Sequence, residues 1–199
     1  MNEEIPDGLA DSPRMTVLLR DARTGRSAAF DVLFERLYGE LHALAHKQRV
    51  RGGKPDGINT TMLVNEAFLR FAGAGQLVAA DRQHFLAYAA NAMRSVIVDI
   101  LRAENAHKRG SGDRALTLNT NIAEQVPTSG GEALRIHEAL LDLAKIDPQL
   151  VQIVEMRFFA GLTDAEIAES LEISPRTVHR HWQKARLFLY AQLNEDDHS

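Results

Sequence analysis

The sequence of 199 residues contains no cysteine, and aromatic residues make up only 6% of it. Without cysteine the chain cannot form disulfides or thiolate metal sites. It also lacks a His-Glu-x-x-His pattern, and we expect no metal site and no cofactor. No apolar run approaches the roughly 20 residues of a membrane-spanning helix, so no membrane contact is predicted. The acidic first 13 residues lack the pattern of a signal peptide, and we therefore expect a cytoplasmic protein.

The net charge of −4 is unevenly distributed along the chain. Residues 1–13 and 194–199 together carry seven of the 27 acidic residues and none of the 23 basic ones. The part of the chain between them is therefore mildly basic. Because neutralisation of phosphates drives non-specific binding to nucleic acid, we expect modest free affinity for DNA and a dependence on a partner.

Apolar residues recur at helical spacing in nearly every segment. We expect helices over residues 13–25, 27–50, 60–72, 81–107, 132–144 and 150–160, and two more within residues 162–193. Residues 111–131 are rich in Gly, Ser, Thr and Asn and have no sustained period, which is typical of a linker. The sequence thus predicts an all-α fold with two small helical domains, at residues 13–110 and 132–193, joined by a flexible linker at 111–131.

Residues 162–193, LTDAEIAESLEISPRTVHRHWQKARLFLYAQL, predict a helix, a short turn and a second helix. Thr163 and Glu166 have the spacing of a capping box, and Ser174 followed by Pro175 begins the second helix. Within residues 162–193, all acidic residues lie in the first helix and the turn, and all Lys and Arg residues lie in the second helix. A helix-turn-helix that reads DNA needs this polarity, because only its second helix enters the major groove.

The second helix of this pair separates an apolar stripe from a polar face. The stripe is formed by Val178, Trp182, Ala185 and Leu189. An Arg guanidinium can form two hydrogen bonds to the edge of a guanine, and Lys and Thr side chains can bind phosphates. The predicted DNA contacts are Arg176, Thr177, Arg180, His181 and Lys184. The alternative, a solvated basic face on an ordinary helical hairpin, does not account for the capping box, the short turn and the acid-free second helix together.

The helix expected over residues 81–107 carries an aromatic ring, an amide and guanidinium groups at positions predicted to face outward. Such a ring stacks on an unpaired base, while the cations follow the nucleic-acid backbone. The candidate contacts to single-stranded nucleic acid are Tyr88, Asn91, Arg94 and Arg102. The alternative is a half-buried Tyr88 beside solvated arginines.

The helix over residues 60–72 has more apolar side chains than one buried stripe needs. A second apolar surface on a short helix indicates a protein partner. The candidate contacts are Val64, Asn65, Glu66, Phe68 and Leu69. The alternative is a helix that is enclosed on all sides.

Three segments, in this order, resemble the extracytoplasmic-function (ECF) group of the sigma-70 family, the small sigma factors of bacterial RNA polymerase. MLVNEAFLRF, residues 62–71, resembles the helix that grips the polymerase clamp. HFLAYAANAMRSVIVDILRAENAHKRG, residues 84–110, resembles the helix that melts and reads the minus-ten promoter element. MRFFAGLTDAEIAESLEISPRTVHRHWQKARLFL, residues 156–189, resembles the domain that reads the minus-thirty-five element.

This resemblance implies a subunit that binds core RNA polymerase and directs initiation at promoter DNA, without enzymatic activity of its own. The three sets of candidate residues then contact the clamp, the minus-ten element and the minus-thirty-five element. The alternative is a stand-alone helix-turn-helix regulator, which would bind palindromic DNA as a dimer. A sigma factor would instead be a monomer that binds DNA weakly alone. A nucleic-acid enzyme would need a metal-ligand or nucleophile pattern that the sequence lacks.

One departure from the family concerns the start of the clamp-binding helix. Many members carry an acidic cluster of the DAED type there, whereas residues 59–62 contain no acid. A phosphate on Thr60 or Thr61 would add negative charge at a helix N-terminus, where the helix dipole favours it. The resemblance extends to the sigma subgroup that serine/threonine kinases control, so both threonines are candidate phosphorylation sites. The alternative is that they only cap the helix; an anti-sigma factor is the other candidate regulatory partner.

Overall fold

The computed structural model describes residues 17–19, 21, 27–55, 57–73, 79–110 and 129–195. Its elements are α2 (Ser27–Arg51), α3 (Thr60–Gly73), α4 (Arg82–Gly110), α5 (Ser129–Ile146), α6 (Pro148–Val154), the π-helix η1 (Glu155–Phe159), α7 (Asp164–Ser170) and α8 (Pro175–Glu195). No strand occurs within these ranges, and the all-α prediction is confirmed. None of the helices described is both long and apolar enough to cross a membrane.

Two expected segments lie mostly outside the described residues. Of the first helix, expected over residues 13–25, only residues 17–19 and 21 are described, and these are helical. Of the linker expected at 111–131, only the last three residues are described, and they form the first turn of α5.

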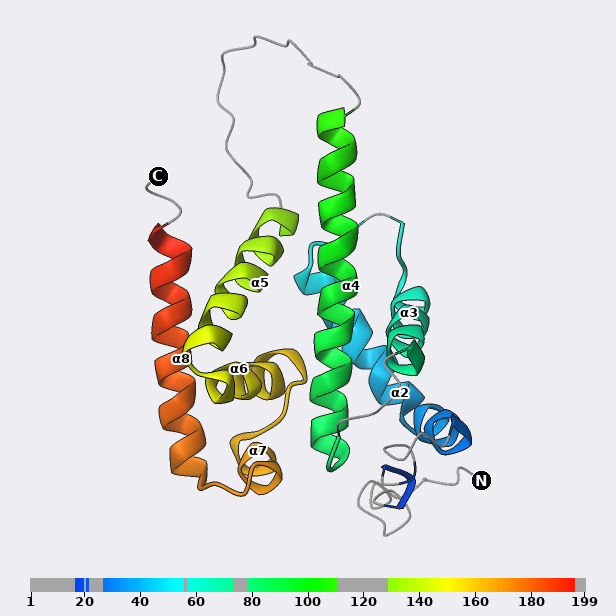
Figure 1. Ribbon diagram of the computed structural model, residues 1–199, viewed down its shortest axis with the longest axis vertical. Coiled ribbons are helices and arrows are strands. Elements are labelled where there is room, and N and C mark those ends of the chain that lie inside the picture. The colour runs from blue at the N-terminus through cyan, green and yellow to red at the C-terminus, as the bar shows by residue number, and fades with distance from the viewer. Residues whose placement is uncertain are drawn as a thin grey trace, which may run out of the picture.

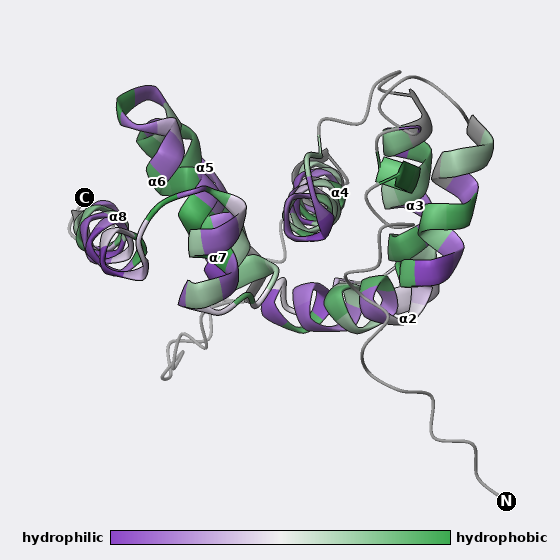
Figure 2. Cartoon of the chain, turned by 90° about the horizontal axis from the view of Figure 1, so that it is seen from below, coloured by the Kyte–Doolittle hydropathy of each residue, from purple (hydrophilic) through white to green (hydrophobic). Residues whose placement is uncertain are grey.

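The long helix α4 lies between two groups of helices (Figure 1). The N-terminal helices α2 and α3 pack on one side of it, and the C-terminal helices α5 to α8 lie on the other. Figure 2, a view close to the axis of α4, has the same arrangement, with α4 in the middle. Both groups therefore use α4 as their common neighbour.

Side-chain caps begin α3, α4 and α8, the last of them at the Ser174 that the sequence predicts. Asn59, Asp81 and Ser174 each accept a hydrogen bond from the backbone N–H three residues later, at 2.9, 2.7 and 3.1 Å. The capping box is complete, since the Glu166 N–H donates to Thr163 Oγ1 at 3.3 Å and the Thr163 N–H donates to Glu166 Oε2 at 2.8 Å. These local bonds orient the two helices of the predicted helix-turn-helix.

The helix expected over residues 150–160 is not uniform. The α-helical part ends at Val154, and a π-helix continues it from Glu155 to Phe159. Gly161 follows with a φ of +79°, the left-handed conformation expected of a helix-ending glycine. The wider turn buries Met156 and Phe159 in the core and directs Glu155 toward α4.

The hydrophobic core is continuous between the two groups of helices. Leu143, Val154 and Phe159 of the C-terminal helices belong to the same buried cluster as the leucines of α2 and α3. Ala87 of α4, in turn, packs with Ile167 and other residues of the C-terminal helices. The buried residues of α4 therefore lie on more than one side of the helix.

Two methionines test the central position of α4. Met93 of α4 is fully buried, whereas Met62 of α3 is 50% exposed. Met93→Ala should lower the free energy of unfolding by about 2–5 kcal/mol, because it leaves a cavity. Met62→Ala should lower it by less than about 0.5 kcal/mol. Urea denaturation followed by circular dichroism measures both, and an equally small loss for the two variants would contradict this description of the core.

Candidate functional site

The predicted DNA-reading helix α8 packs through its apolar stripe. Val178 and Ala185 are fully buried, and Trp182 and Leu189 are half-buried. The guanidinium of Arg157 lies 4.9 Å from the centre of the Trp182 ring, which adds a cation–π contact to this packing. The stripe predicted from the sequence is confirmed, and it leaves the opposite face of α8 outward.

The predicted DNA contacts on α8 differ in their exposure. Arg176, Arg180 and Lys184 are exposed, as expected. Thr177 is half-buried, and its hydroxyl lies 2.9 Å from Ser174 Oγ within the helix cap. His181 is half-buried as well. The three long cations therefore form the accessible part of this set.

The turn before α8 separates the acidic from the basic helix. Glu172, in this turn, has a φ of +53°. Two acids of α7 are held by nearby groups, since Asp164 Oδ1 lies 2.6 Å from Arg157 Nη1 and Glu166 bonds to Thr163. The hydrogen bonds from Thr163 also hold the pKa of the Glu166 carboxyl below its ordinary value. Both acids therefore have partners other than the arginines of α8.

The predicted polymerase contacts on α3 differ in their exposure. Asn65, Glu66 and Leu69 are exposed, with Leu69 62% exposed. Phe68 is half-buried, and its ring centre lies 4.6 Å from that of Phe34 on α2. Val64 is fully buried, contrary to its expected place on the accessible face. The helical period explains this, because Val64 lies on the same inner side of α3 as its buried neighbours.

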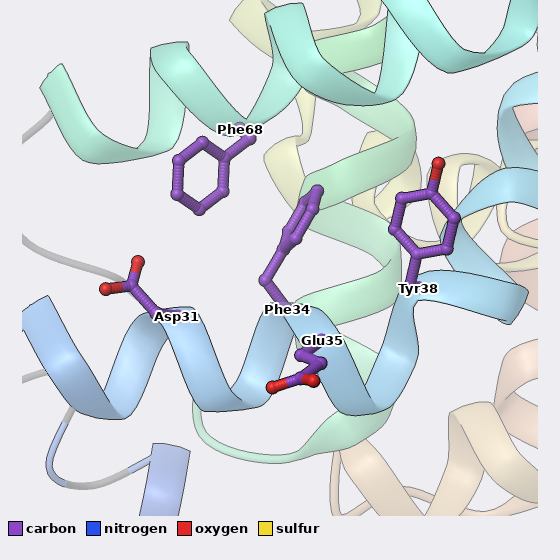
Figure 3. A pocket seen from close by; sticks show the side chains of 5 residues that line it. All are labelled: Asp31, Phe34, Glu35, Tyr38 and Phe68. Atoms are coloured by element: carbon purple, nitrogen blue, oxygen red, sulfur yellow. The ribbon is translucent and has the colours of Figure 1, made fainter.

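A surface hollow of about 450 Å³ joins this part of α3 to α2. It is lined by Asp31, Phe34, Glu35, Tyr38 and Phe68. In Figure 3 the Phe68 side chain extends from α3 toward Phe34, and Tyr38 stands beside them on α2. The contribution of α2 was not predicted, because the sequence indicated a partner surface only on the helix over residues 60–72. The signal available was Tyr38, which lies four residues after Phe34 and so on the same side of the helix.

The structure covers two of the predicted single-strand contacts on α4. Arg94 is only 8% exposed, and its Nη2 donates to Glu155 Oε1 at 2.7 Å. Asn91 Nδ2 donates to the same carboxylate oxygen at 2.6 Å. These side chains do not face outward as expected, because η1 and α5 pack against this side of α4. Long-range packing of this kind leaves no local signal in the sequence.

The other two predicted contacts on α4 remain partly or fully accessible. Tyr88 is half-buried, as the alternative interpretation held, and its ring centre lies 4.9 Å from that of Phe71. Arg102 is exposed, and its Nη2 lies 3.9 Å from Glu138 Oε1 of α5. Of the four predicted nucleic-acid contacts on α4, two are therefore covered by other helices and two are at least partly accessible.

Burial changes the titration of the groups beside Arg94. Burial raises the pKa of the Glu155 carboxyl, while the charge of Arg94 and the hydrogen bond from Asn91 oppose this rise. Burial, and then the positive charge of Arg94, lower the pKa of His137, whose Nδ1 lies 2.5 Å from Arg94 Nη1. A neutral His137 accepts a hydrogen bond there, so Arg94 has both a charged and a neutral partner.

The first turn of α3 contains the two threonines that are candidate phosphorylation sites. Asn59 supplies the side-chain cap, since its Oδ1 accepts from the Met62 N–H. Thr60 is half-buried at the first position of α3, and Thr61 is exposed at the second. The first turn of α3 contains no acid. Asn59 is therefore the residue that caps α3.

Comparisons with known proteins complete this description. A search of curated proteins found no match. A solved structure described as CnrH in complex with the cytosolic domain of CnrY is 20% identical, with a TM-score of 0.38, over 92% of this chain and 99% of that chain. That likeness is too weak to carry an argument. The family model for the ECF sigma factor, however, matches residues 13–195. The chain therefore belongs to the ECF sigma factor family and is an RNA polymerase sigma factor that directs transcription initiation.

Proposed function

We propose that this sigma factor uses three surfaces, one for the polymerase and two for the promoter. The exposed part of α3 and the adjoining hollow bind the clamp of core RNA polymerase. The outer face of α8 reads the minus-thirty-five element, and the accessible positions of α4, Tyr88 and Arg102, contact unpaired bases of the minus-ten element. Sigma factors are generally non-enzymatic; we infer that this chain has no catalytic activity and acts in the cytoplasm, where the polymerase supplies the chemistry.

The strongest support for this proposal comes from the outer face of α8. Arg176, Arg180 and Lys184 follow one another at intervals of four residues, so they lie along one side of the helix, and all three are exposed. A guanidinium fork that meets a guanine edge contributes about 1–3 kcal/mol of discrimination between bases. Lysine adds a phosphate contact that positions the helix without reading sequence. The apolar stripe on the opposite side packs α8 against the other C-terminal helices.

The proposed polymerase surface combines apolar and acidic groups. Leu69 is exposed on α3, and the hollow between α2 and α3 has an aromatic floor with Asp31 and Glu35 beside it. An exposed apolar group next to a hollow favours burial of a partner's side chain. The two carboxylates favour a partner that brings basic side chains to the same place.

Transcription in vitro with core polymerase and a library of genomic fragments tests the proposed α8 contact. We expect the wild-type chain to produce discrete new start sites. Arg180→Ala should lower their yield by about tenfold, the loss expected when one bidentate base contact is removed. Arg186→Ala is the matched control, because Arg186 is exposed on another side of α8 and should leave the yield unchanged. Equal losses for both variants would contradict the assignment of this face.

Binding to core polymerase tests the α3 surface separately. Leu69→Ala should weaken the complex by about fivefold or more, because it removes an exposed apolar side chain from the proposed contact. Leu141→Ala, on the exposed side of α5, removes the same side chain from a surface with no proposed role, and it should have no effect. Fluorescence anisotropy of labelled chain against core polymerase measures both. An unchanged affinity for Leu69→Ala would exclude this residue from the interface.

We also propose that a serine/threonine kinase controls the binding of this chain to core polymerase. Thr61 is exposed at the start of α3, whose first turn contains no acid. A phosphate there adds close to two negative charges near the positive end of the helix dipole. It would supply the acid that many family members carry at this position. An anti-sigma factor that occupies the α2–α3 surface is the other form of control that the family suggests.

Thr61→Glu mimics part of that charge in a system without kinase. It should raise the affinity for core polymerase and the yield of transcripts several-fold, because the carboxylate replaces the missing acidic cluster. Thr61→Gln has nearly the same shape without the charge and should behave as the wild type. If Thr61→Glu leaves both quantities at the wild-type level, the kinase proposal fails for this residue.

A further inference from the structure

A cavity of about 170 Å³ lies where the end of α2, the middle of α4, the start of α5 and η1 meet. Apolar side chains from three of these elements form most of its wall: Ile97, Val98, Ala133, Ile136, Phe158 and Phe159. None of the described residues that line it belongs to α3 or α8. The cavity is therefore separate from the exposed part of α3 and from the helix proposed to read duplex DNA.

The polar groups inside the cavity already have partners. Gln48 is buried, and its Nε2 donates to the carbonyl oxygen of Phe159 at 3.1 Å. The charge of Arg94 is compensated by Glu155, whose Oε1 lies 2.7 Å from Arg94 Nη2. The interior consequently offers mainly apolar surface to a ligand, and burial of an apolar group there is favourable.

The mouth of the cavity carries one charge of each sign. Arg51 and Glu132 both line the cavity and are both exposed, which places them at its opening. The Arg51 guanidinium lies 4.2 Å from the centre of the Phe158 ring and donates to the carbonyl oxygen of that residue. Partial burial lowers the pKa of Arg51 from its ordinary value, so water solvates this cation incompletely. Within the described part of the chain, neither Arg51 nor Glu132 forms an ion pair.

From this arrangement we propose that the cavity binds a small apolar α-amino acid. The side chain of the ligand fills the apolar interior, its carboxylate pairs with Arg51 and its ammonium group pairs with Glu132. A dry apolar cavity of about 150 Å³ accommodates benzene, so a leucine or phenylalanine side chain matches the available space. A carboxylic acid without an ammonium group meets the like charge of Glu132, and an amine without a carboxylate meets the like charge of Arg51.

The bound amino acid contacts four elements at once. It touches α2, α4, α5 and η1, and it binds the folded chain but not the unfolded one. Binding of this kind raises stability by mass action. The packing of these elements thereby becomes sensitive to the concentration of an amino acid, a property that goes beyond the proposed contacts to polymerase and promoter.

Calorimetric titration of the full-length chain with L-leucine and with L-phenylalanine tests the site. We expect saturable binding, and a melting temperature that rises with the concentration of the ligand. The amino acid that binds more tightly is then compared with the acid and the amine of its carbon skeleton. These are 4-methylpentanoate and 3-methylbutylamine for leucine, or 3-phenylpropionate and 2-phenylethylamine for phenylalanine. Each should bind about fivefold more weakly, because it lacks one ion pair at the mouth, and glycine, which lacks the apolar group, should not bind detectably.

A variant that fills the cavity locates the binding site. Ala133→Leu adds three carbon atoms to the wall and should weaken binding of the amino acid by about tenfold or more. Ala144→Leu makes the same substitution at another half-buried position of α5, outside the cavity, and should bind as the wild type does. Circular dichroism and the melting temperature without ligand show whether both variants are folded.

A second variant tests the charge at the mouth. Glu132→Gln should weaken binding of the amino acid about fivefold and leave binding of the matching carboxylic acid no weaker, so the preference between the two disappears. Glu138→Gln changes another exposed glutamate of α5, outside the cavity, and should keep the preference. Because Glu132 is exposed, this variant retains the fold and completes the test even if Ala133→Leu does not.

Each outcome decides the proposal. Failure of both amino acids to bind overturns it. Binding that folded Ala133→Leu and Ala144→Leu chains retain equally places the ligand elsewhere and also overturns it. A carboxylic acid that binds the wild type as tightly as the amino acid overturns the assigned class of ligand. Loss of binding in Ala133→Leu or loss of the preference in Glu132→Gln, with both control variants unchanged, supports it.

Discussion

The burial of α4 on two sides is the constraint on which the rest of the structure depends. Its N-terminal neighbours and its C-terminal neighbours both bury apolar side chains against it, and the resulting core is continuous. Burial of apolar surface is the main favourable term in folding, so α4 cannot separate from either group without a loss of stability. Any polar group on α4 that faces a neighbour must consequently find a partner there.

Arg94 illustrates how this requirement is met. A buried guanidinium without a counter-ion is costly, and Arg94 bonds to the Glu155 carboxylate and to His137. Asn91 donates to the same Glu155 oxygen. The ring of Phe159 adds a cation–π contact at 5.2 Å. Such an arrangement favours one relative position of the helices over others, because the bonds require exact geometry. The packing of α4 against the C-terminal helices therefore also determines whether Asn91 and Arg94 are accessible.

Much of the fold followed from local patterns in the chain. The capping box of Thr163 and Glu166, the caps at Asn59, Asp81 and Ser174, and the apolar stripe of α8 all involve residues within a few positions of one another. The exposure of Arg176, Arg180 and Lys184 followed from the same helical period. The placement of Val64 did not, because it required knowledge of which side of α3 meets α2 and α4. The π-helix and the hollow beside Tyr38 were missed for a similar reason.

The sequence by itself determined the helices, the polarity of the helix-turn-helix and the sigma-factor resemblance, since these depend on spacing along the chain and on local hydrogen bonds. Only the tertiary structure decided which of the polar side chains on α4 are accessible. Asn91 and Arg94 have the composition of a nucleic-acid surface, yet they meet a glutamate more than 60 residues away in the chain. Contacts between residues so distant arise from the packing of whole helices, and no local pattern contains them.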